Sequence, residues 1–154
     1  DGQTILTGSS DNTARLWDTA SGQEIQRFKG HEGEVNSVAF APDGQTILTG
    51  SDDKTARLWD PSTGQEIRRF KGHEDEVFSV AFAPDGQTIL TGSDDNTARL
   101  WDTASGQEIQ RFKGHEDEVW SVAFAPDGQT ILTGSFDNTA RLWFLDDAPD
   151  QAER

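Results

Sequence analysis

A histidine, a threonine, an aspartate and a tryptophan recur at fixed spacing along this chain. In one copy they are His73, Thr91, Asp95 and Trp101. A hydroxyl, an imidazole and a carboxylate are the groups of a hydrolytic triad, in which the imidazole takes the hydroxyl proton and the carboxylate orients the ring. This set is therefore the first candidate for chemistry, as a nucleophilic site.

Repetition favours a structural interpretation of these residues. The sets, in chain order, are Thr7, Asp11 and Trp17; His31, Thr49, Asp53 and Trp59; His73, Thr91, Asp95 and Trp101; and His115, Thr133, Asp137 and Trp143. An active site has no need of three copies, whereas hydrogen bonds that support one unit of a repeat would be duplicated with the unit. Buried polar groups require partners, so we interpret the set as a structural relay that lacks its histidine in the first unit.

Other catalytic and ligand-binding motifs are absent from the sequence. His73-Glu74 has no second histidine four residues later, as a zinc-protease helix requires, and the chain has no Cys. Asp94-Asp95-Asn96 lacks the rest of a calcium-binding loop and its final Glu. No glycine-rich phosphate loop followed by Lys occurs. We expect a protein that is not an enzyme and that binds neither a metal nor a cofactor.

Composition narrows the range of partners. The 154 residues include 28 acidic and 13 basic side chains, for a net charge of −15. Such a chain repels a phosphate backbone, and no apolar run reaches the roughly 20 residues of a membrane helix, so we expect no nucleic acid and no membrane partner. These features favour a soluble protein, cytoplasmic rather than secreted. The chain starts inside a repeat and has no Met, so we expect sequence upstream of Asp1, and targeting stays open.

The elements that position these residues recur with a period of 42 residues, which is the spacing of the tryptophans from Trp17 to Trp143. Each unit contains four short segments with the alternation or the β-branched content of strands, separated by turn-forming residues. In one unit these segments are Val77–Phe82, Thr88–Gly92, Thr97–Trp101 and Gln107–Phe112. No segment has a helical period, so the chain is predicted to be all-β.

Gly-His pairs occur at Gly30-His31, Gly72-His73 and Gly114-His115, and Trp-Asp pairs at Trp17-Asp18, Trp59-Asp60 and Trp101-Asp102, whereas the first unit has no Gly-His pair and Trp143 is followed by Phe144. Repeated in register from residue 1 to residue 143, these pairs resemble the WD-repeat β-propeller family. The resemblance implies a β-propeller built of four-stranded antiparallel blades. It also implies the order of the relay, in which Asp95 accepts from His73, His73 contacts Thr91, and Thr91 reaches the indole N–H of Trp101.

By this resemblance the chain holds about four blade units, and both terminal blades are incomplete. Residues 1–143 are predicted to form the propeller segment, with a partial first blade (1–30), two full blades (31–72 and 73–114) and a partial last blade (115–143). The first blade lacks an inner strand and the last lacks an outer strand. Residues 144–154 are predicted to be an acidic C-terminal tail.

Candidate partner-binding residues are the positions that differ between similar units, together with the acidic residues near them. They are Glu34, Asn36, Asp52, Glu76, Phe78, Asp94, Glu118, Trp120 and Phe136. The resemblance implies that they lie towards the ring face used for partner contact. Aromatic rings beside carboxylates suit a basic peptide or protein, through cation–π contacts and ion pairs. The alternative is that the aromatic side chains fill gaps between neighbouring blades.

Two functions stay open from the sequence. The first is a non-catalytic repeat module that self-assembles into a closed ring, because an open arc of blades would expose apolar faces. Two copies would form a homodimer with eight blade positions, and a seven-bladed ring is the alternative. The second function is a protein- or peptide-binding scaffold. The near-identity of the units favours the first, and it indicates recent duplication, homogenisation or deliberate construction.

Overall fold

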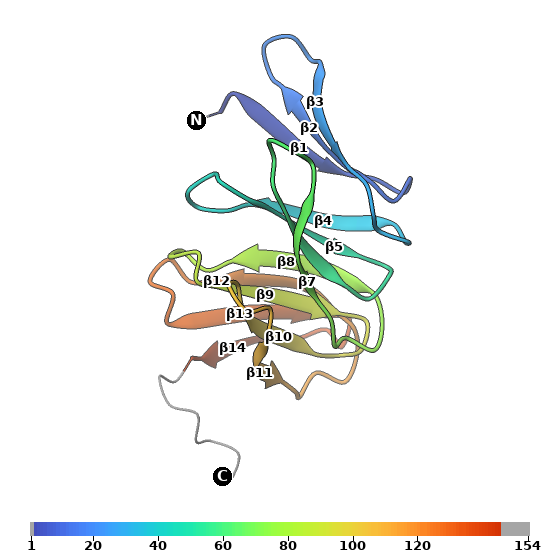
Figure 1. Cartoon of the computed structure of the whole chain (residues 1–154). Helices are drawn as coiled ribbons and strands as arrows, with labels where there is room; N and C mark the ends of the chain where they lie inside the picture. The colour runs from blue at the N-terminus through green and yellow to red at the C-terminus, as the bar shows by residue number, and fades with distance from the viewer. Residues whose placement is uncertain (1, 146–154) are drawn as a thin grey trace.

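The computed structural model describes residues 2–145, which form fourteen β-strands and no helix (Figure 1). The strands are β1 (Thr4–Gly8), β2 (Ala14–Asp18), β3 (Glu24–Phe28), β4 (Val35–Phe40), β5 (Ile47–Ser51), β6 (Ala56–Trp59), β7 (Glu66–Phe70), β8 (Val77–Phe82), β9 (Thr88–Ser93), β10 (Ala98–Asp102), β11 (Glu108–Phe112), β12 (Val119–Phe124), β13 (Thr130–Ser135) and β14 (Ala140–Phe144). They group into four antiparallel sheets that follow one another without closing into a ring (Figure 1). The predicted fold class, an all-β propeller of antiparallel blades with incomplete ends, is confirmed.

Each sheet is one blade, and sequential strands are neighbours within it. Blade 2 has the order β4-β5-β6-β7 and blade 3 the order β8-β9-β10-β11. Blade 1 contains β1-β2-β3 and blade 4 contains β12-β13-β14, so each has three strands within the described residues. β14 includes Phe144, which the sequence assigned to the tail. The rest of the predicted tail, from residue 146, lies outside the described residues, as does Asp1.

The hairpin turn between the second and third strand of each blade requires a left-handed residue. Asn96 has a φ of 66° in blade 3, and Lys54 has a φ of 71° at the same place in blade 2. Asn adopts this conformation more readily than most residues because its short polar side chain bonds locally. The backbone N–H of Thr97 donates to Asp95 Oδ1 over 3.0 Å. The turn therefore fixes the carboxylate that the relay needs.

The apolar core lies between the blades rather than inside them. Leu48 and Leu58 of blade 2 pack against Ile89 and Trp101 of blade 3, and all four are buried. Equivalent residues make the cores between blades 1 and 2 and between blades 3 and 4. Because burial of apolar side chains is the main stabilising contribution, each blade depends on its neighbour.

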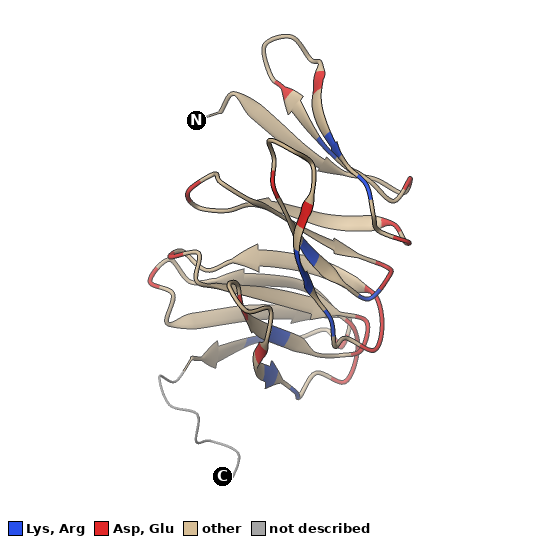
Figure 2. Ribbon diagram, in the orientation of Figure 1, with Lys and Arg blue, Asp and Glu red and all other residues tan. Residues whose placement is uncertain are grey.

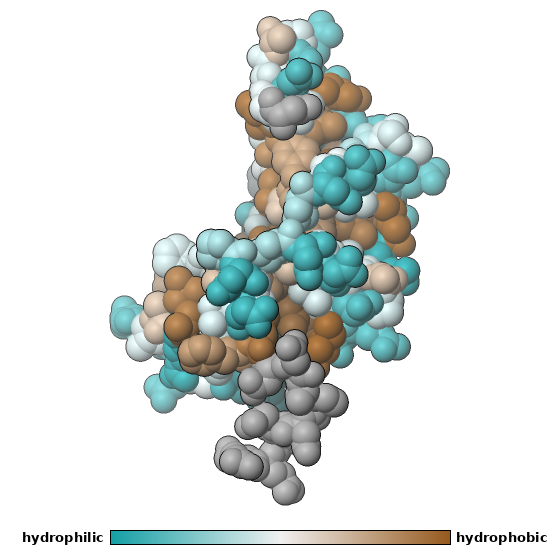
Figure 3. Space-filling model, turned by 90° about the vertical axis from the view of Figure 1, so that its left-hand side faces the viewer, coloured by the Kyte–Doolittle hydropathy of each residue, from teal (hydrophilic) through white to brown (hydrophobic). Residues whose placement is uncertain are grey.

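The two ends of the arc lack such a neighbour. Leu132 and Leu142 of blade 4 are 48% and 60% exposed, although the equivalent Leu48 is fully buried. At the other end Ile5 is 52% exposed, although the equivalent Ile89 is fully buried. Figure 3 shows apolar surface in the lower half of the molecule, above the grey atoms. Each end therefore presents one half of a blade-to-blade core.

Acidic and basic residues occupy different parts of the fold. Asp and Glu lie mainly in the loops, while Lys and Arg lie mainly on the strands (Figure 2). The described residues include no helix with the length and apolar character that crossing a membrane requires.

Candidate functional site

The structure brings together the four relay residues of blade 3. His73 Nδ1 lies 2.7 Å from Asp95 Oδ2, and His73 Nε2 lies 2.6 Å from Thr91 Oγ1. The indole N–H of Trp101 donates to the same Thr91 oxygen over 2.9 Å. The relay thereby ties the loop before β8 to β9, to the hairpin turn and to β10.

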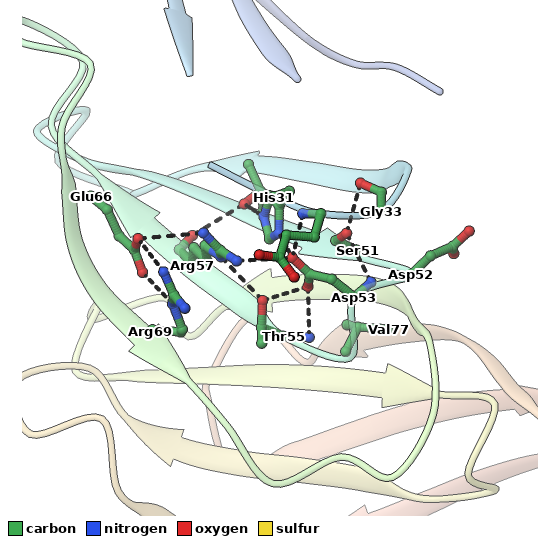
Figure 4. Close-up of polar contacts among 12 residues, drawn as sticks. His31, Gly33, Ser51, Asp52, Asp53, Thr55, Arg57, Glu66, Arg69 and Val77 are labelled. Atoms are coloured by element: carbon green, nitrogen blue, oxygen red, sulfur yellow. Dashed lines mark hydrogen bonds and ion pairs between the residues drawn. The ribbon is translucent and has the colours of Figure 1, made fainter. Parts of the chain in front are cut away.

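Blades 2 and 4 repeat this arrangement. In both blades the His–Asp and His–Thr distances are 2.7 Å and the Trp–Thr distance is 2.9 Å. The residues are His31, Thr49, Asp53 and Trp59 in blade 2, and His115, Thr133, Asp137 and Trp143 in blade 4. Figure 4 shows His31 and Asp53 of blade 2 with their polar neighbours.

Burial decides what this set can do chemically. The side chains of His73 and Asp95 are 1% and 6% exposed, and Thr91 is fully buried. A neutral imidazole satisfies every partner when Nδ1–H donates to the carboxylate and Nε2 accepts the Thr91 hydroxyl hydrogen. The Thr91 oxygen already accepts an indole N–H, and a substrate has no path to it. We infer a structural role rather than nucleophilic catalysis.

Electrostatics match this assignment of protons. Burial lowers the pKa of His73, and its contact with Asp95 only partly counteracts the effect, so the pKa lies below its ordinary value. Burial raises the pKa of Asp95, but the hydrogen bonds from His73 and Thr97 and the nearby imidazole outweigh it and hold the pKa well below its usual range. At neutral pH a neutral imidazole therefore faces a carboxylate.

An arginine extends the relay and was missed by the sequence reasoning. Arg99 is 1% exposed, and it places Nη2 3.1 Å from Asp95 Oδ2 and Nη1 3.2 Å from Glu108 Oε2. Glu108 also pairs with Arg111, whose Nε lies 2.9 Å from Oε1. Figure 4 shows the corresponding chain of charges in blade 2, which runs through Arg57. The sequence does contain a pattern that could have revealed this arginine, because an Arg precedes every relay tryptophan by two residues.

The glycine of each Gly-His pair makes room for this arginine. Gly72 has a φ of +153°, and a Cβ there would lie 2.9 Å from Arg99 Nη1 and 3.2 Å from Trp101 Cη2. A side chain at this position would push the guanidinium away from Asp95. The Gly-His pair therefore supplies both the imidazole and the space beside it.

Blade 1 holds the part of the relay that does not need a histidine. The indole N–H of Trp17 donates to Thr7 Oγ1 over 2.8 Å, and Asp11 accepts from the backbone and side chain of Thr13 and from Arg15. The Thr13 side-chain hydrogen bond is the main reason that the pKa of Asp11 falls to about 2. Thr7 is exposed, unlike its buried counterparts in the other blades.

The predicted partner-binding residues lie along the boundaries between blades. In blade 2, Asn36 Nδ2 donates to Asp52 Oδ1 over 2.6 Å and to the Val77 carbonyl of blade 3 over 3.2 Å. Glu34 is exposed beside this pair, and its carbonyl accepts the N–H of Asp52 over 3.0 Å. Asn36 therefore bridges two blades.

The next boundary, between blades 3 and 4, is more acidic. Phe78 replaces Asn36 there and has no donor to offer Asp94. Burial and the facing carboxylate of Glu118 raise the pKa of Asp94, and a hydrogen bond with Asp75 raises the pKa of Glu76. Asp75, Glu76 and Asp94 could each offer a metal ligand within 4.8 Å of the others. Acidic surface groups commonly gather in this way without an ion, so we assign no metal to them.

Two of the predicted residues form an exposed aromatic pair on blade 4. The rings of Trp120 and Phe136 stack with centroids 5.4 Å apart and an interplanar angle of 25°. Both side chains are just over half exposed. The backbone N–H of Phe136 donates to the carbonyl of Glu118 over 3.0 Å, which places the pair beside the acidic boundary. This backbone contact connects the aromatic pair to Glu118, whose carboxylate faces Asp94, and we refer to Trp120, Phe136, Glu118 and Asp94 together as the strip.

Comparison with known proteins agrees with this geometry. Several curated proteins match over about one repeat. The matches are 55% identity over 40 residues with a guanine nucleotide-binding protein subunit beta of Arabidopsis thaliana, 49% over 39 residues with dynein assembly factor with WD repeat domains 1 of Homo sapiens, and 54% over 39 residues with ribosome assembly protein 4 of Chaetomium thermophilum. Each match covers 25% of this chain and, in the same order, 11%, 9% and 8% of the length of the relative.

A family model also covers most of the chain. The model described as WD domain, G-beta repeat matches residues 1–18, 22–60, 64–102 and 106–143. The first match covers β1 and β2, and each later match begins with the outer strand of one blade and ends with the third strand of the next, so that the four matches include every relay tryptophan. The chain belongs to the WD domain, G-beta repeat family.

Proposed function

We propose that this chain is a non-catalytic protein-interaction module whose two end faces bind further blades of the same kind, in the first place those of a second copy. One observation carries the proposal. The end of blade 4 exposes Leu132 and Leu142, and the end of blade 1 exposes Ile5 beside Trp17. These are the two halves of the core that is buried at every internal boundary.

Such a contact is head to tail. The leucine face of one copy would receive the isoleucine face of the next, as Leu48 and Leu58 receive Ile89 inside the chain. A head-to-tail contact forms a ring if its rotation closes and a filament if it does not. The propeller curvature favours closure, and two copies with four blades each would give the proposed eight-bladed homodimer.

Light scattering on the purified chain tests this proposal. We expect a mass of twice the 16.9 kDa of one chain, and a return to the single-chain mass in Leu142→Lys, because a buried unpaired charge is costly. Ile109→Lys is the matched control. Ile109 is 54% exposed on the outer strand of blade 3, and its counterparts Ile25 and Ile67 are exposed in other blades, so it belongs to neither end face of the arc. A single-chain mass for the unmodified protein would reject self-assembly.

The strip of aromatic and acidic residues favours a second candidate function, recognition of a basic peptide. A Lys or Arg side chain over Trp120 and Phe136 would gain cation–π contacts, and its charge would relieve the repulsion between Asp94 and Glu118. Fluorescence anisotropy with an arginine-containing peptide tests this function. If Trp120→Ala lowers the affinity no more than Ile109→Ala does, the strip is not the binding site.

A further inference from the structure

β1, the first strand of blade 1, corresponds in sequence to β5 of blade 2. β5 pairs with an inner strand, β4, whereas within the described residues β1 has no such partner. β1 and β5 share the residues Ile-Leu-Thr-Gly. β5 pairs with β4 and β6 and is buried along its whole length, whereas β1 pairs, within residues 2–145, with β2 alone and is exposed at Ile5, Thr7 and Gly8. The open edge of β1 therefore presents backbone donors and acceptors to a further antiparallel strand.

Blade 1 also presents the receiving side of the relay. In blade 2 the segment before the inner strand supplies two donors to Asp53 Oδ2: His31 Nδ1 at 2.7 Å and the N–H of Glu32 at 3.1 Å. The blade 1 counterparts of Asp53 and Thr49 are Asp11 and Thr7. Both are already held in place, Asp11 by Thr13 and Arg15 and Thr7 by Trp17.

A third contact would come from the neighbouring blade. The inner-strand serine of each blade accepts the N–H of a valine in the next: Ser37 from Val80 and Ser79 from Val122, both over 3.2 Å. The valine at that place in blade 2 is Val38. A strand on the edge of β1 with a serine at the same position would reach it.

We propose that blade 1 binds an extended peptide as its inner strand, with the pattern Gly-His-Glu-x-Glu-Val-x-Ser-Val-Ala-Phe that residues 30–40 display. The register follows blade 2, where serine, valine, alanine and phenylalanine lie opposite glycine, threonine, leucine and isoleucine. In blade 1 the last four are Gly8, Thr7, Leu6 and Ile5. Main-chain hydrogen bonds supply affinity in such strand addition, and the side chains supply specificity. The peptide's histidine would lie between Asp11 and Thr7.

A labelled synthetic peptide with the sequence of residues 30–40 tests the proposal by fluorescence anisotropy. The whole chain carries Leu142→Lys, so that self-assembly does not compete. We expect saturable binding of one peptide, weakened about tenfold when alanine replaces the peptide's histidine and about tenfold in Asp11→Asn, because hydrogen bonds to a charged group are among the stronger ones. Ile109→Lys should leave the affinity unchanged. The peptide is acidic, so attraction to the acidic strip would not explain its binding.

Amide hydrogen exchange locates the bound peptide. Saturation should slow exchange in β1 and leave β13 unchanged, since β13 already has an inner neighbour in β12. The proposal is overturned by the absence of saturable binding, by equal affinity for the peptide without histidine, or by binding that leaves exchange in β1 unaltered. None of these outcomes depends on whether the unmodified chain forms a ring.

Discussion

Arg99 and Asp95 form an ion pair inside blade 3, with side chains only 2% and 6% exposed and with Nη2 3.1 Å from Oδ2. His73 contacts the same carboxylate oxygen. The backbone N–H of Glu74 donates to this oxygen as well, over 3.0 Å, so three donors from different parts of the blade converge on one atom in the hairpin turn.

Removing the arginine should be costly, because it leaves the buried Asp95 carboxylate without its cationic partner. We expect Arg99→Met to lower the free energy of unfolding by about 3 kcal/mol, as for other broken buried ion pairs. Urea denaturation followed by tryptophan fluorescence measures this. The matched control is Arg15→Met, where the pair with Asp11 is 26% and 43% exposed, and its effect should be clearly smaller. Equal losses would mean that burial does not set the strength of this contact.

The threonine of the relay offers the same comparison between blades. Thr91→Val keeps the shape of the side chain but leaves the Trp101 indole N–H and His73 Nε2 without a partner. The expected loss is about 2 kcal/mol. Thr7→Val makes the same change in blade 1, where water can replace the hydroxyl because the residue is exposed. If the two variants unfold at the same denaturant concentration, the relay contributes nothing beyond a single hydrogen bond.

Acid should weaken the fold through His73. The folded-state pKa of His73 lies below the ordinary value of 6.5, so the unfolded chain binds the proton more readily and stability falls as the pH drops below 6.5. We expect the free energy of unfolding to decrease from pH 7.5 to pH 5.5, and to decrease less in His73→Gln, which cannot titrate there. Subtracting the free energies of unfolding of the two proteins at each pH removes the contribution of the carboxylates, which titrate in both. Parallel curves would contradict the assignment of a neutral buried ring.

Removing a charge from the acidic boundary between blades 3 and 4 should stabilise the fold, whereas the changes described above should destabilise it. Asp94→Asn removes the repulsion with Glu118, and we expect it to raise the free energy of unfolding by about 0.5 kcal/mol at low salt, an effect that salt would screen. Asp52→Asn is the control at the same place in blade 2. Asp52 already accepts a hydrogen bond from Asn36, so this variant should give no gain. A gain in both, or in neither, would show that the two boundaries do not differ electrostatically.

The sequence predicts much of this fold because the units repeat. Alternation and turn residues place the strands to within a residue or two, and the resemblance to a known family supplies the order of contacts from Asp95 to Trp101. The structure places the four residues of blade 3 at hydrogen-bonding distances in this order, and the structural role of the set stays a proposal.

Contacts between units were harder to predict, since no local pattern shows which side chain faces the next blade. Asn36 donates to the Val77 carbonyl across a boundary, whereas the sequence analysis considered it only as a candidate for partner binding. Arg99 was missed for a similar reason. A charged residue on a strand normally indicates exposure, and only its neighbours Gly72 and Glu108, distant in the sequence, explain its burial.

The repeated cores between blades make this chain a one-dimensional array in which each unit is coupled to its nearest neighbours alone. In the single chain, as in the Leu142→Lys variant, unfolding should then begin by fraying at the ends, where a blade has one neighbour, and should spread inward blade by blade. Amide protons of β5 and β9 should consequently exchange most slowly, and those of β1 and β14 fastest. A chain lengthened by identical units would gain a constant increment of stability for each one.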